Sequence, residues 1–259
     1  MRSLIEKILF LIALVVFLYS SYQLATYYMT MHQVKEEFHA IEEEAFPQHI
    51  VEEPVNVETN RSTTKKAKKK ESTFQYHMLK KQNEDCIGWI RIEDTNINYP
   101  VMYQEGDNDF YLHRNFQKEY SIAGTPFLDG RCQPFKTGEH LIVYAHHMKD
   151  GSMFAGLEKY KKKEYYESHK EIQLYIENTL HRYEIFGTCI IQADKEYIFY
   201  ELPEQGNQEA YQQYIQKVLK KMLYETGEEP EQEEPLLLLS TCEYSNEDGR
   251  MFVIAKKIS

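Results

Sequence analysis

The sequence predicts a mainly β domain, a barrel or a sandwich, that follows a single membrane helix. Three observations indicate this: many short segments carry strand signals, few carry helical signals, and no charged residue occurs from Ile8 to Met31. Many short strands are typical of a β-barrel or a β-sandwich. The strand candidates are Trp89–Ile92, Ile97–Tyr103, Leu141–Ala145, Ile172–Ile176, His181–Ile191, Tyr197–Tyr200, Leu236–Thr241 and Met251–Ile258.

The N-terminal segment predicts a membrane anchor. As a helix, Ile8–Met31 reaches about 36 Å, which is enough for a hydrocarbon core of about 30 Å. No convincing small-x-small cleavage site follows it, so an uncleaved anchor is favoured over a cleaved signal peptide. Because Arg2 and Lys7 precede the span, we expect a cytoplasmic N-terminus and an exported remainder. Interfacial aromatic anchors are indicated by Tyr19, Tyr22, Tyr27 and Tyr28.

The chain divides into three expected parts. Residues 1–31 form a cytoplasmic stub and transmembrane anchor, residues 32–73 an extracellular spacer, and residues 74–259 a folded domain. The spacer begins as a polar, Glu-rich helix and continues without apolar periodicity. It contains the basic run Lys65–Lys70, which is interpreted as a solvated linker or as a contact with anionic head groups or wall polymers.

Helices interrupt the strands of the domain. Phe74–Asp85 is compatible with a short entry helix, and Met153–Lys163 is a second candidate. The strongest helical signal is Asn207–Tyr224, because its apolar positions recur at i, i+3, i+4, i+7 and i+8. The formal net charge is −11 and no basic face is apparent, which argues against a nucleic-acid partner.

The four cysteines do not predict a disulfide framework or a zinc site. Cys86, Cys132, Cys189 and Cys242 are widely spaced, and no C-x-x-C pair is present. Cys189 lies in an apolar strand pattern and is expected to be a buried small hydrophobe. Cys242 differs, because it ends an apolar run and is followed by polar residues.

The setting of Cys242 indicates a nucleophile. Leu236–Thr241 leads into Cys242, and after a polar turn Arg250 opens the next apolar run. Two strands joined by a tight turn are antiparallel, so the guanidinium is expected beside the thiol. A neighbouring cation favours the thiolate, which is the nucleophilic form, and can stabilise a developing oxyanion. The alternative is a cysteine that lies in a hairpin by chance.

A cysteine nucleophile needs a proton carrier, which is usually histidine. Among the ten histidines, His146 stands out because an apolar run, Leu141–Ala145, ends there and a turn follows at Asp150-Gly151. The alternative for His146 is a loop histidine that only caps the strand.

Taken together, these motifs resemble sortases, the cysteine transpeptidases of Gram-positive bacteria, and class B sortases in particular. The resemblance runs in order from Asp85 to Ile258, and it implies an eight-stranded sortase-type β-barrel with a few peripheral helices. One departure is Ala145, where the family usually has glycine. The motifs are Ile87-Gly-Trp-Ile-Arg-Ile, Asp107-Asn-Asp-Phe-Tyr-Leu-His-Arg114, Gly124-Thr-Pro-Phe-Leu-Asp129, Tyr144-Ala-His-His-Met-Lys-Asp-Gly-Ser-Met-Phe154 and Ser240-Thr-Cys242 with Arg250.

By motif position, the resemblance implies that Cys242 is the nucleophile, His146 the catalytic histidine and Arg250 the essential arginine. It implies no metal or cofactor. The implied enzyme sits in the cell membrane and cleaves a C-terminal sorting signal of secreted proteins after Thr, of the Asn-Pro-x-Thr-x or x-Pro-x-Thr-Gly type. A Cys242 thioester then passes the acyl group to a peptidoglycan amine. The implied groove residues are Asn108, Leu112, Tyr144, Ser240, Thr241 and Glu243.

Three other functions stay open at the level of sequence. The enzyme can be a pilin-polymerising sortase, for which the accepting amine is a pilin lysine. It can be a cysteine peptidase that mainly hydrolyses, since water and amine compete for the same thioester. A membrane-tethered module without catalysis requires that cysteine, histidine and arginine lie at three strand ends by coincidence.

Overall fold

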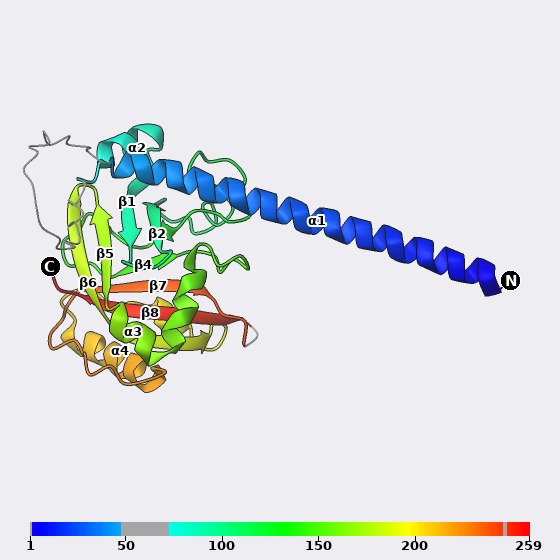
Figure 1. The fold of residues 1–259 in the computed structure, drawn as a ribbon. Coiled ribbons are helices and arrows are strands. Elements are labelled where there is room, and N and C mark those ends of the chain that lie inside the picture. Colours follow the sequence, from blue (N-terminus) through cyan, green and yellow to red (C-terminus); the bar gives the residue numbers. More distant parts are fainter. Residues whose placement is uncertain (1, 48–72, 246–247) are drawn as a thin grey trace, which may run out of the picture.

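A computed structural model describes residues 2–47, 73–245 and 248–259. The basic run Lys65–Lys70, interpreted as a linker or a contact with anionic groups, lies outside the described residues. Eight strands close into a barrel in the order β1-β2-β3-β4-β7-β8-β6-β5, which confirms the predicted eight-stranded barrel (Figure 1). The strands are β1 (Cys86–Arg91), β2 (Asn98–Met102), β3 (Phe127–Leu128), β4 (Leu141–Tyr144), β5 (Glu171–Ile176), β6 (Thr179–Gln192), β7 (Leu236–Cys242) and β8 (Gly249–Lys257).

Seven of the strand predictions fall on observed strands, and one is wrong. Tyr197–Tyr200 forms a 3-10 helix, η2, in the long connection between β6 and β7. The missing strand is β3, which is too short to show alternation. It is defined by its neighbours, because Phe127 pairs with Met102 of β2 and with Tyr144 of β4.

The helical predictions are confirmed in place but not in every detail. Asn207 caps α4 (Gln208–Lys221), since its side-chain oxygen accepts a hydrogen bond from the Ala210 amide at 3.1 Å. The entry helix is α2 (Tyr76–Gln82). The region predicted as one helix from Met153 is a 3-10 helix, η1 (Phe154–Lys161), followed by α3 (Lys163–Ser168).

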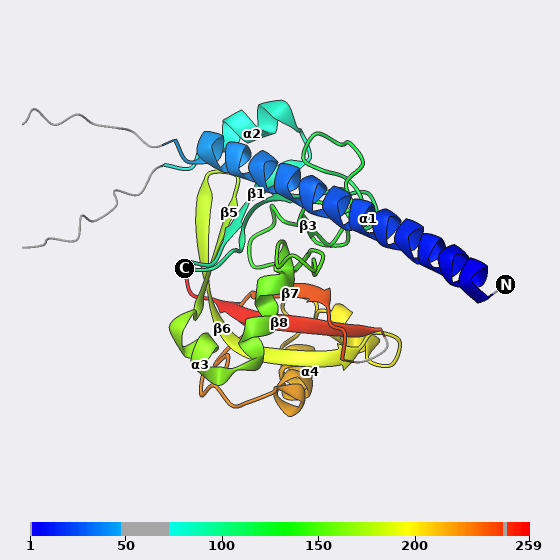
Figure 2. The same cartoon turned by 45° about the vertical axis from the view of Figure 1, so that its right-hand side comes forward.

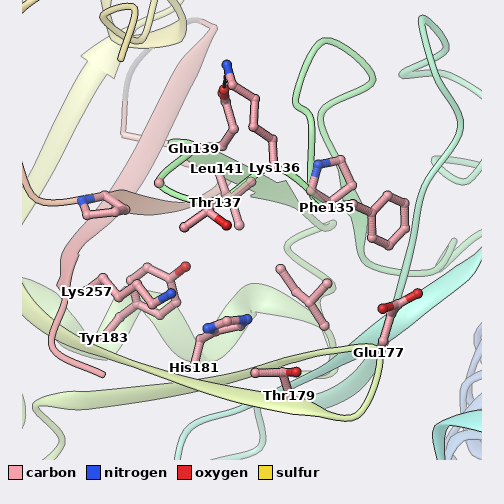
Figure 3. A pocket seen from close by; sticks show the side chains of 14 residues that line it. Phe135, Lys136, Thr137, Glu139, Leu141, Glu177, Thr179, His181, Tyr183 and Lys257 are labelled. Atoms are coloured by element: carbon pink, nitrogen blue, oxygen red, sulfur yellow. Dashed lines mark ion pairs between the residues drawn. The ribbon is translucent and has the colours of Figure 1, made fainter. Parts of the chain in front are cut away.

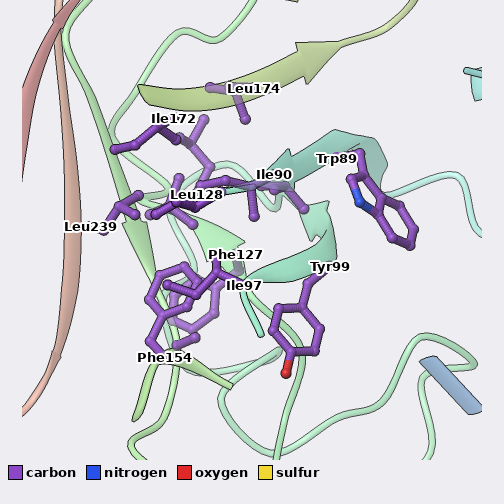
Figure 4. Packing of buried hydrophobic residues seen from close by; sticks show 14 of the residues in the cluster. Trp89, Ile90, Ile97, Tyr99, Phe127, Leu128, Phe154, Ile172, Leu174 and Leu239 are labelled. Carbon is purple, nitrogen blue, oxygen red and sulfur yellow. The ribbon is translucent and has the colours of Figure 1, made fainter. Parts of the chain in front are cut away.

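The apolar strands β7 and β8 are buried on both faces. Leu237, Leu239 and Val253 point into the barrel core, part of which is shown in Figure 4. The alternate residues Leu238 and Phe252 belong to a second cluster that includes the buried face of α4. A strand with two buried faces reads as a continuous apolar run rather than an alternating one. This explains the run of four leucines before Ser240.

The N-terminal helix α1 (Arg2–Ala45) has two different halves. It is long and apolar enough to cross a membrane, and every residue from Leu4 to Thr26 is exposed. From Tyr27 onward, one face of the same helix packs on the barrel (Figures 1 and 2). The helix predicted for the first part of the spacer, residues 32–45, is present as the end of α1. It packs on the domain, which the sequence did not predict. The buried side chains are Met31, Phe38, Ile41 and Ala45.

Candidate active site

Strand register brings the three predicted catalytic residues to one place. β4 and β7 are parallel, and Tyr144 is paired with Ser240. The chain runs two residues further on each side, to His146 and to Cys242. β7 and β8 are antiparallel, and Cys242 is paired directly with Arg250. His146, Cys242 and Arg250 therefore lie at neighbouring strand ends, with the cysteine in the middle.

The three side chains open into one pocket. Residues paired across two antiparallel strands project from the same face of the sheet, so Cys242 and Arg250 share a face. The pocket has a volume of about 300 Å³. Of the nine residues predicted from the sequence, eight line it: Asn108, Leu112, Tyr144, His146, Ser240, Thr241, Cys242 and Arg250.

Cys242 is the only one of the four cysteines suited to be a nucleophile. All four are free, and three of them are buried, Cys189 as predicted. Burial raises the pKa of Cys86, Cys132 and Cys189 to about 12, so their thiolates are scarce near neutral pH. Cys242 is half-buried at the rim of the pocket.

His146 is held by the backbone of the loop that carries Leu112. Its Nε2 lies 2.8 Å from the Leu112 carbonyl oxygen, and because a carbonyl only accepts, Nε2 must donate. Nδ1 is then the ring nitrogen that can exchange a proton. Burial lowers the pKa of His146, the Leu112 carbonyl opposes that shift, and nearby His113 adds to it. The neutral imidazole is therefore the favoured form near neutral pH.

The next residue, His147, contacts the backbone of the nucleophile. Its Nδ1 lies 3.0 Å from the Cys242 carbonyl oxygen, and its Nε2 lies 3.5 Å from a carboxylate oxygen of Glu158 in η1. The Tyr244 hydroxyl donates to the His147 carbonyl at 3.1 Å, and the two rings meet edge to face. His147 thus connects the end of β7 to η1. No role was predicted for His147 from the sequence.

Glu243 does not line the pocket. Its carboxylate is buried and accepts hydrogen bonds from Lys161 at 2.7 Å and from the Ser245 hydroxyl at 2.6 Å. Burial acts to raise the pKa of Glu243, but these two partners outweigh it and hold the pKa below its usual range. Lys161 also pairs with Glu158 at 3.0 Å. The carbonyl group of Cys242 and the side chain of Glu243 are therefore both linked to residues of η1.

The wall of the pocket is built from side chains whose polar groups are mostly engaged. The Tyr144 hydroxyl donates to buried Asp129 at 2.7 Å, and the Asn108 side-chain oxygen accepts from the Gly130 amide at 2.7 Å. The Thr241 hydroxyl donates to the Ala145 carbonyl at 2.8 Å. The buried Ser240 hydroxyl makes no well-formed hydrogen bond with the described residues.

The pocket continues into a wider hollow. That hollow has a volume of about 560 Å³ and shares Asn108, Tyr144 and Tyr200 with the pocket. Tyr200, at the end of η2, was missed as a pocket residue because its segment was predicted as a strand. Together the two hollows form a continuous groove, and Cys242 lies in the narrower of the two.

Alanine at position 145 fits the observed backbone. The described non-glycine residues with positive φ are Asp94, Lys118, Met153, Glu177 and Asp248, so Ala145 does not need the glycine usual in the resembling family. The described residues contain no group of three or more histidine, cysteine or acidic side chains placed to hold a metal ion.

A separate hollow lies at the opposite end of the same strands. It has a volume of about 200 Å³ and is lined by residues at the start of β4 and the end of β8, such as Leu141 and Lys257 (Figure 3). Phe135, His181 and Tyr183 also line it. It is remote from Cys242 along the strands and marks the other end of the barrel.

A half-buried thiol between a histidine and an arginine, at the strand ends of a closed barrel, defines a site for cysteine-dependent acyl transfer. A family model described as "Sortase domain" matches residues 90–258. Sortase B of Listeria monocytogenes is 32% identical over 260 residues, which covers 100% of this chain and 98% of that protein.

Solved structures agree with this match. The crystal structure of Clostridium perfringens sortase B has a TM-score of 0.65 and 33% identity, and the match covers 71% of this chain and 100% of that one. A "Staphylococcus aureus sortase B-substrate complex" has a TM-score of 0.64 and 31% identity, with 71% and 84% covered. The chain belongs to the sortase family. Within that family it is a class B sortase, a cysteine transpeptidase.

Proposed function

We propose that this sortase is anchored in the cell membrane by α1 and attaches secreted proteins to the cell wall. In this proposal it cleaves a C-terminal sorting signal after Thr and transfers the acyl group to a peptidoglycan amine. The observation that carries the proposal is the placement of His146, Cys242 and Arg250 at three neighbouring strand ends that open into one pocket.

In the first half of the reaction, the Cys242 thiolate attacks the carbonyl carbon of the Thr residue and a C–S bond forms. The carbonyl oxygen becomes negatively charged, and the Arg250 guanidinium beside Cys242 stabilises it. The C–N bond then breaks. Protonated His146 donates a proton from Nδ1 to the departing amine, which leaves a thioester on Cys242.

In the second half, the accepting amine attacks the thioester carbon. Neutral His146 takes a proton from this amine as the new C–N bond forms, and Arg250 again faces the oxyanion. The C–S bond breaks and the Cys242 thiolate is regenerated. His146 is neutral at this stage because it gave its Nδ1 proton to the departing amine in the first half, and its lowered pKa favours that form.

The groove offers specific partners for a sorting signal. The Ser240 hydroxyl is buried near the Tyr200 hydroxyl and makes no well-formed hydrogen bond with the described residues. A polar substrate side chain would therefore satisfy it. The Asn108 amide nitrogen is a second donor, and Leu112 supplies an apolar contact for a proline. The Staphylococcus aureus relative has been solved as a sortase B-substrate complex, which supports the proposal that this chain also binds a substrate. Glu243 would act indirectly, by holding the peptide that follows Cys242.

The test uses the full chain in detergent with fluorogenic peptides of the Asn-Pro-x-Thr-x and x-Pro-x-Thr-Gly types. We expect cleavage after Thr and an acyl adduct on Cys242 by mass spectrometry, and neither with Cys242→Ala. Cys132→Ala is the matched control, because it removes a thiol that is buried and outside the pocket. Absence of an adduct with every peptide, in a folded protein, would contradict the proposal.

The acceptor decides between transfer and hydrolysis. An added peptidoglycan-type amine is expected to appear in the product at the expense of the free acid. A product that stays free acid at high amine concentration would identify a hydrolase. Transfer only to a lysine-bearing protein would identify a pilin-polymerising enzyme.

A further inference from the structure

The membrane helix leaves no length for a spacer between the bilayer and the catalytic domain. Residues 4–26 of α1 are all exposed, and the first side chain packed against the domain is Tyr27. Twenty-three helical residues reach about 35 Å, which a hydrocarbon core of about 30 Å nearly consumes. If α1 spans the membrane as proposed above, the docked half of the same helix begins at the bilayer surface.

The direction of the docked half decides which end of the barrel faces the bilayer. At its far end, Phe46 stacks edge to face on Trp89 of β1 and on Tyr175 of β5. At the end nearest the span, the Tyr27 hydroxyl lies near the backbone of Lys149 and Asp150, in the loop that follows His146. In Figures 1 and 2, the exposed half of α1 extends past the β7–β8 turn, on the side away from the C-terminus.

We infer that the active-site end of the domain rests on the outer surface of the bilayer that α1 crosses. The contact surface consists of the Lys149–Asp150 turn and Tyr244, and the occupant is the lipid head-group layer. Tyr244 is 69% exposed beside the turn that joins β7 and β8. Tyrosine is favoured at membrane–water interfaces because its ring is apolar and its hydroxyl is polar. The inference rests on the proposed spanning role of α1.

The docked helix also supports the loop that carries the catalytic histidine. Phe38 of α1 packs edge to face on Tyr99, with ring centroids 5.2 Å apart. The Tyr99 hydroxyl accepts a hydrogen bond from the Met153 amide at 3.0 Å, and the Phe154 amide donates to the His146 carbonyl at 2.9 Å. The position of the loop that carries His146 is therefore coupled to the docked half of α1.

The experiment measures the depth of two positions in the full chain, reconstituted in phosphatidylcholine–phosphatidylglycerol nanodiscs. An exposed thiol is introduced by Tyr244→Cys or by Phe135→Cys in a Cys242→Ser background and labelled with a fluorophore under native conditions, in which Cys86, Cys132 and Cys189 are buried. Phe135 is the matched control, since it is 59% exposed and lines the hollow at the other end of the barrel. We expect head-group quencher lipids to quench the label at 244 several-fold more than the label at 135. Equal quenching, or none at either position, would overturn the inference.

A second arm separates this inference from the proposed anchor. A flexible Gly-Ser insertion between Thr26 and Tyr27 restores a spacer, so quenching at 244 is expected to fall to the level at 135. Co-flotation with vesicles should stay unchanged. If the unmodified chain does not float with vesicles, both the anchor and the surface contact fail. If it floats without quenching at 244, only the surface contact fails.

Discussion

The Nδ1 atom of His147 lies 3.0 Å from the carbonyl oxygen of Cys242, so the neighbour of the proposed catalytic histidine holds the backbone of the proposed nucleophile. The same ring faces Glu158, and Glu158 is joined through Lys161 to Glu243. The end of β7 is therefore fixed from two sides by η1. A nucleophile works best when its position is set before the substrate arrives.

The first prediction concerns this contact. His147→Ala is expected to lower kcat/KM for peptide cleavage by about 3- to 10-fold, because one hydrogen bond contributes about 0.5–1.5 kcal/mol. His147→Asn retains a side-chain donor and is expected to recover much of the loss. The rate of Cys242 alkylation at a fixed pH should change in the alanine variant alone, because only that variant releases the Cys242 carbonyl. Equal losses in both variants, in step with a lower Tm, would indicate a purely structural residue.

Arg250→Lys keeps the positive charge beside Cys242 but removes the planar guanidinium fork. If Arg250 stabilises the oxyanion, kcat is expected to fall by about 100-fold, with KM changing little. Steady-state kinetics with a fluorogenic sorting peptide measures both constants. Arg182→Lys is the control, because Arg182 pairs with Glu171 and lines neither the pocket nor the adjoining hollow. A loss confined to KM would instead make Arg250 a ground-state binding residue.

A third prediction concerns His140, a buried histidine that precedes β4 and contacts the first residue of β7. The Leu236 amide donates to Nδ1 of His140 at 2.9 Å, so His140 must be neutral there, and burial lowers its pKa from 6.5. The unfolded chain then binds more protons than the folded one. The stability contributed by neutral His140 is complete above about pH 6.5 and is lost as the pH falls through the lower, folded-state pKa.

His140→Asn places an amide oxygen near the position of Nδ1 and cannot titrate. We expect the urea midpoint of the wild type to fall more than that of His140→Asn between about pH 7.5 and about pH 5.5. Burial also lowers the pKa of His146 and His181, but both are present in the two proteins. An identical fall in the two midpoints would contradict a role for His140.

The three proposed catalytic residues could be predicted from the sequence because each one ends or opens an apolar run. Strand register then brings the three residues together, since parallel β4 and β7 end at the same edge and β8 begins opposite Cys242. The number of apolar runs predicted a barrel or a sandwich, and the resemblance to sortases implied the barrel. The N-terminal helix could also be predicted, because a long stretch of the sequence carries no charged residue.

Other features depend on partners that lie far away in the sequence. β3 exists only because β2 and β4 lie on either side of it. Glu243 was expected in the groove because it follows Cys242, yet its carboxylate is held by Lys161, 82 residues earlier. Tyr197–Tyr200 has the aromatic content of a strand, but its end packs against Phe252 and Tyr144 from outside the barrel. Local propensity does not reveal such tertiary contacts.

The last prediction tests the closure of the barrel between β1 and β5. A Cβ atom added to Gly88 would lie 1.7 Å from the Tyr175 carbonyl oxygen, a backbone atom that cannot move without breaking the pairing of Gly88 with Ile176. Gly88→Ala is therefore expected to lower the free energy of unfolding by about 3 kcal/mol or more. Gly187→Ala is the matched control in β6, where the nearest atom to an added Cβ is a Val218 side-chain carbon at 3.5 Å. Urea denaturation of the two variants decides the matter, and similar midpoints would mean that β1 and β5 can separate without loss of the fold.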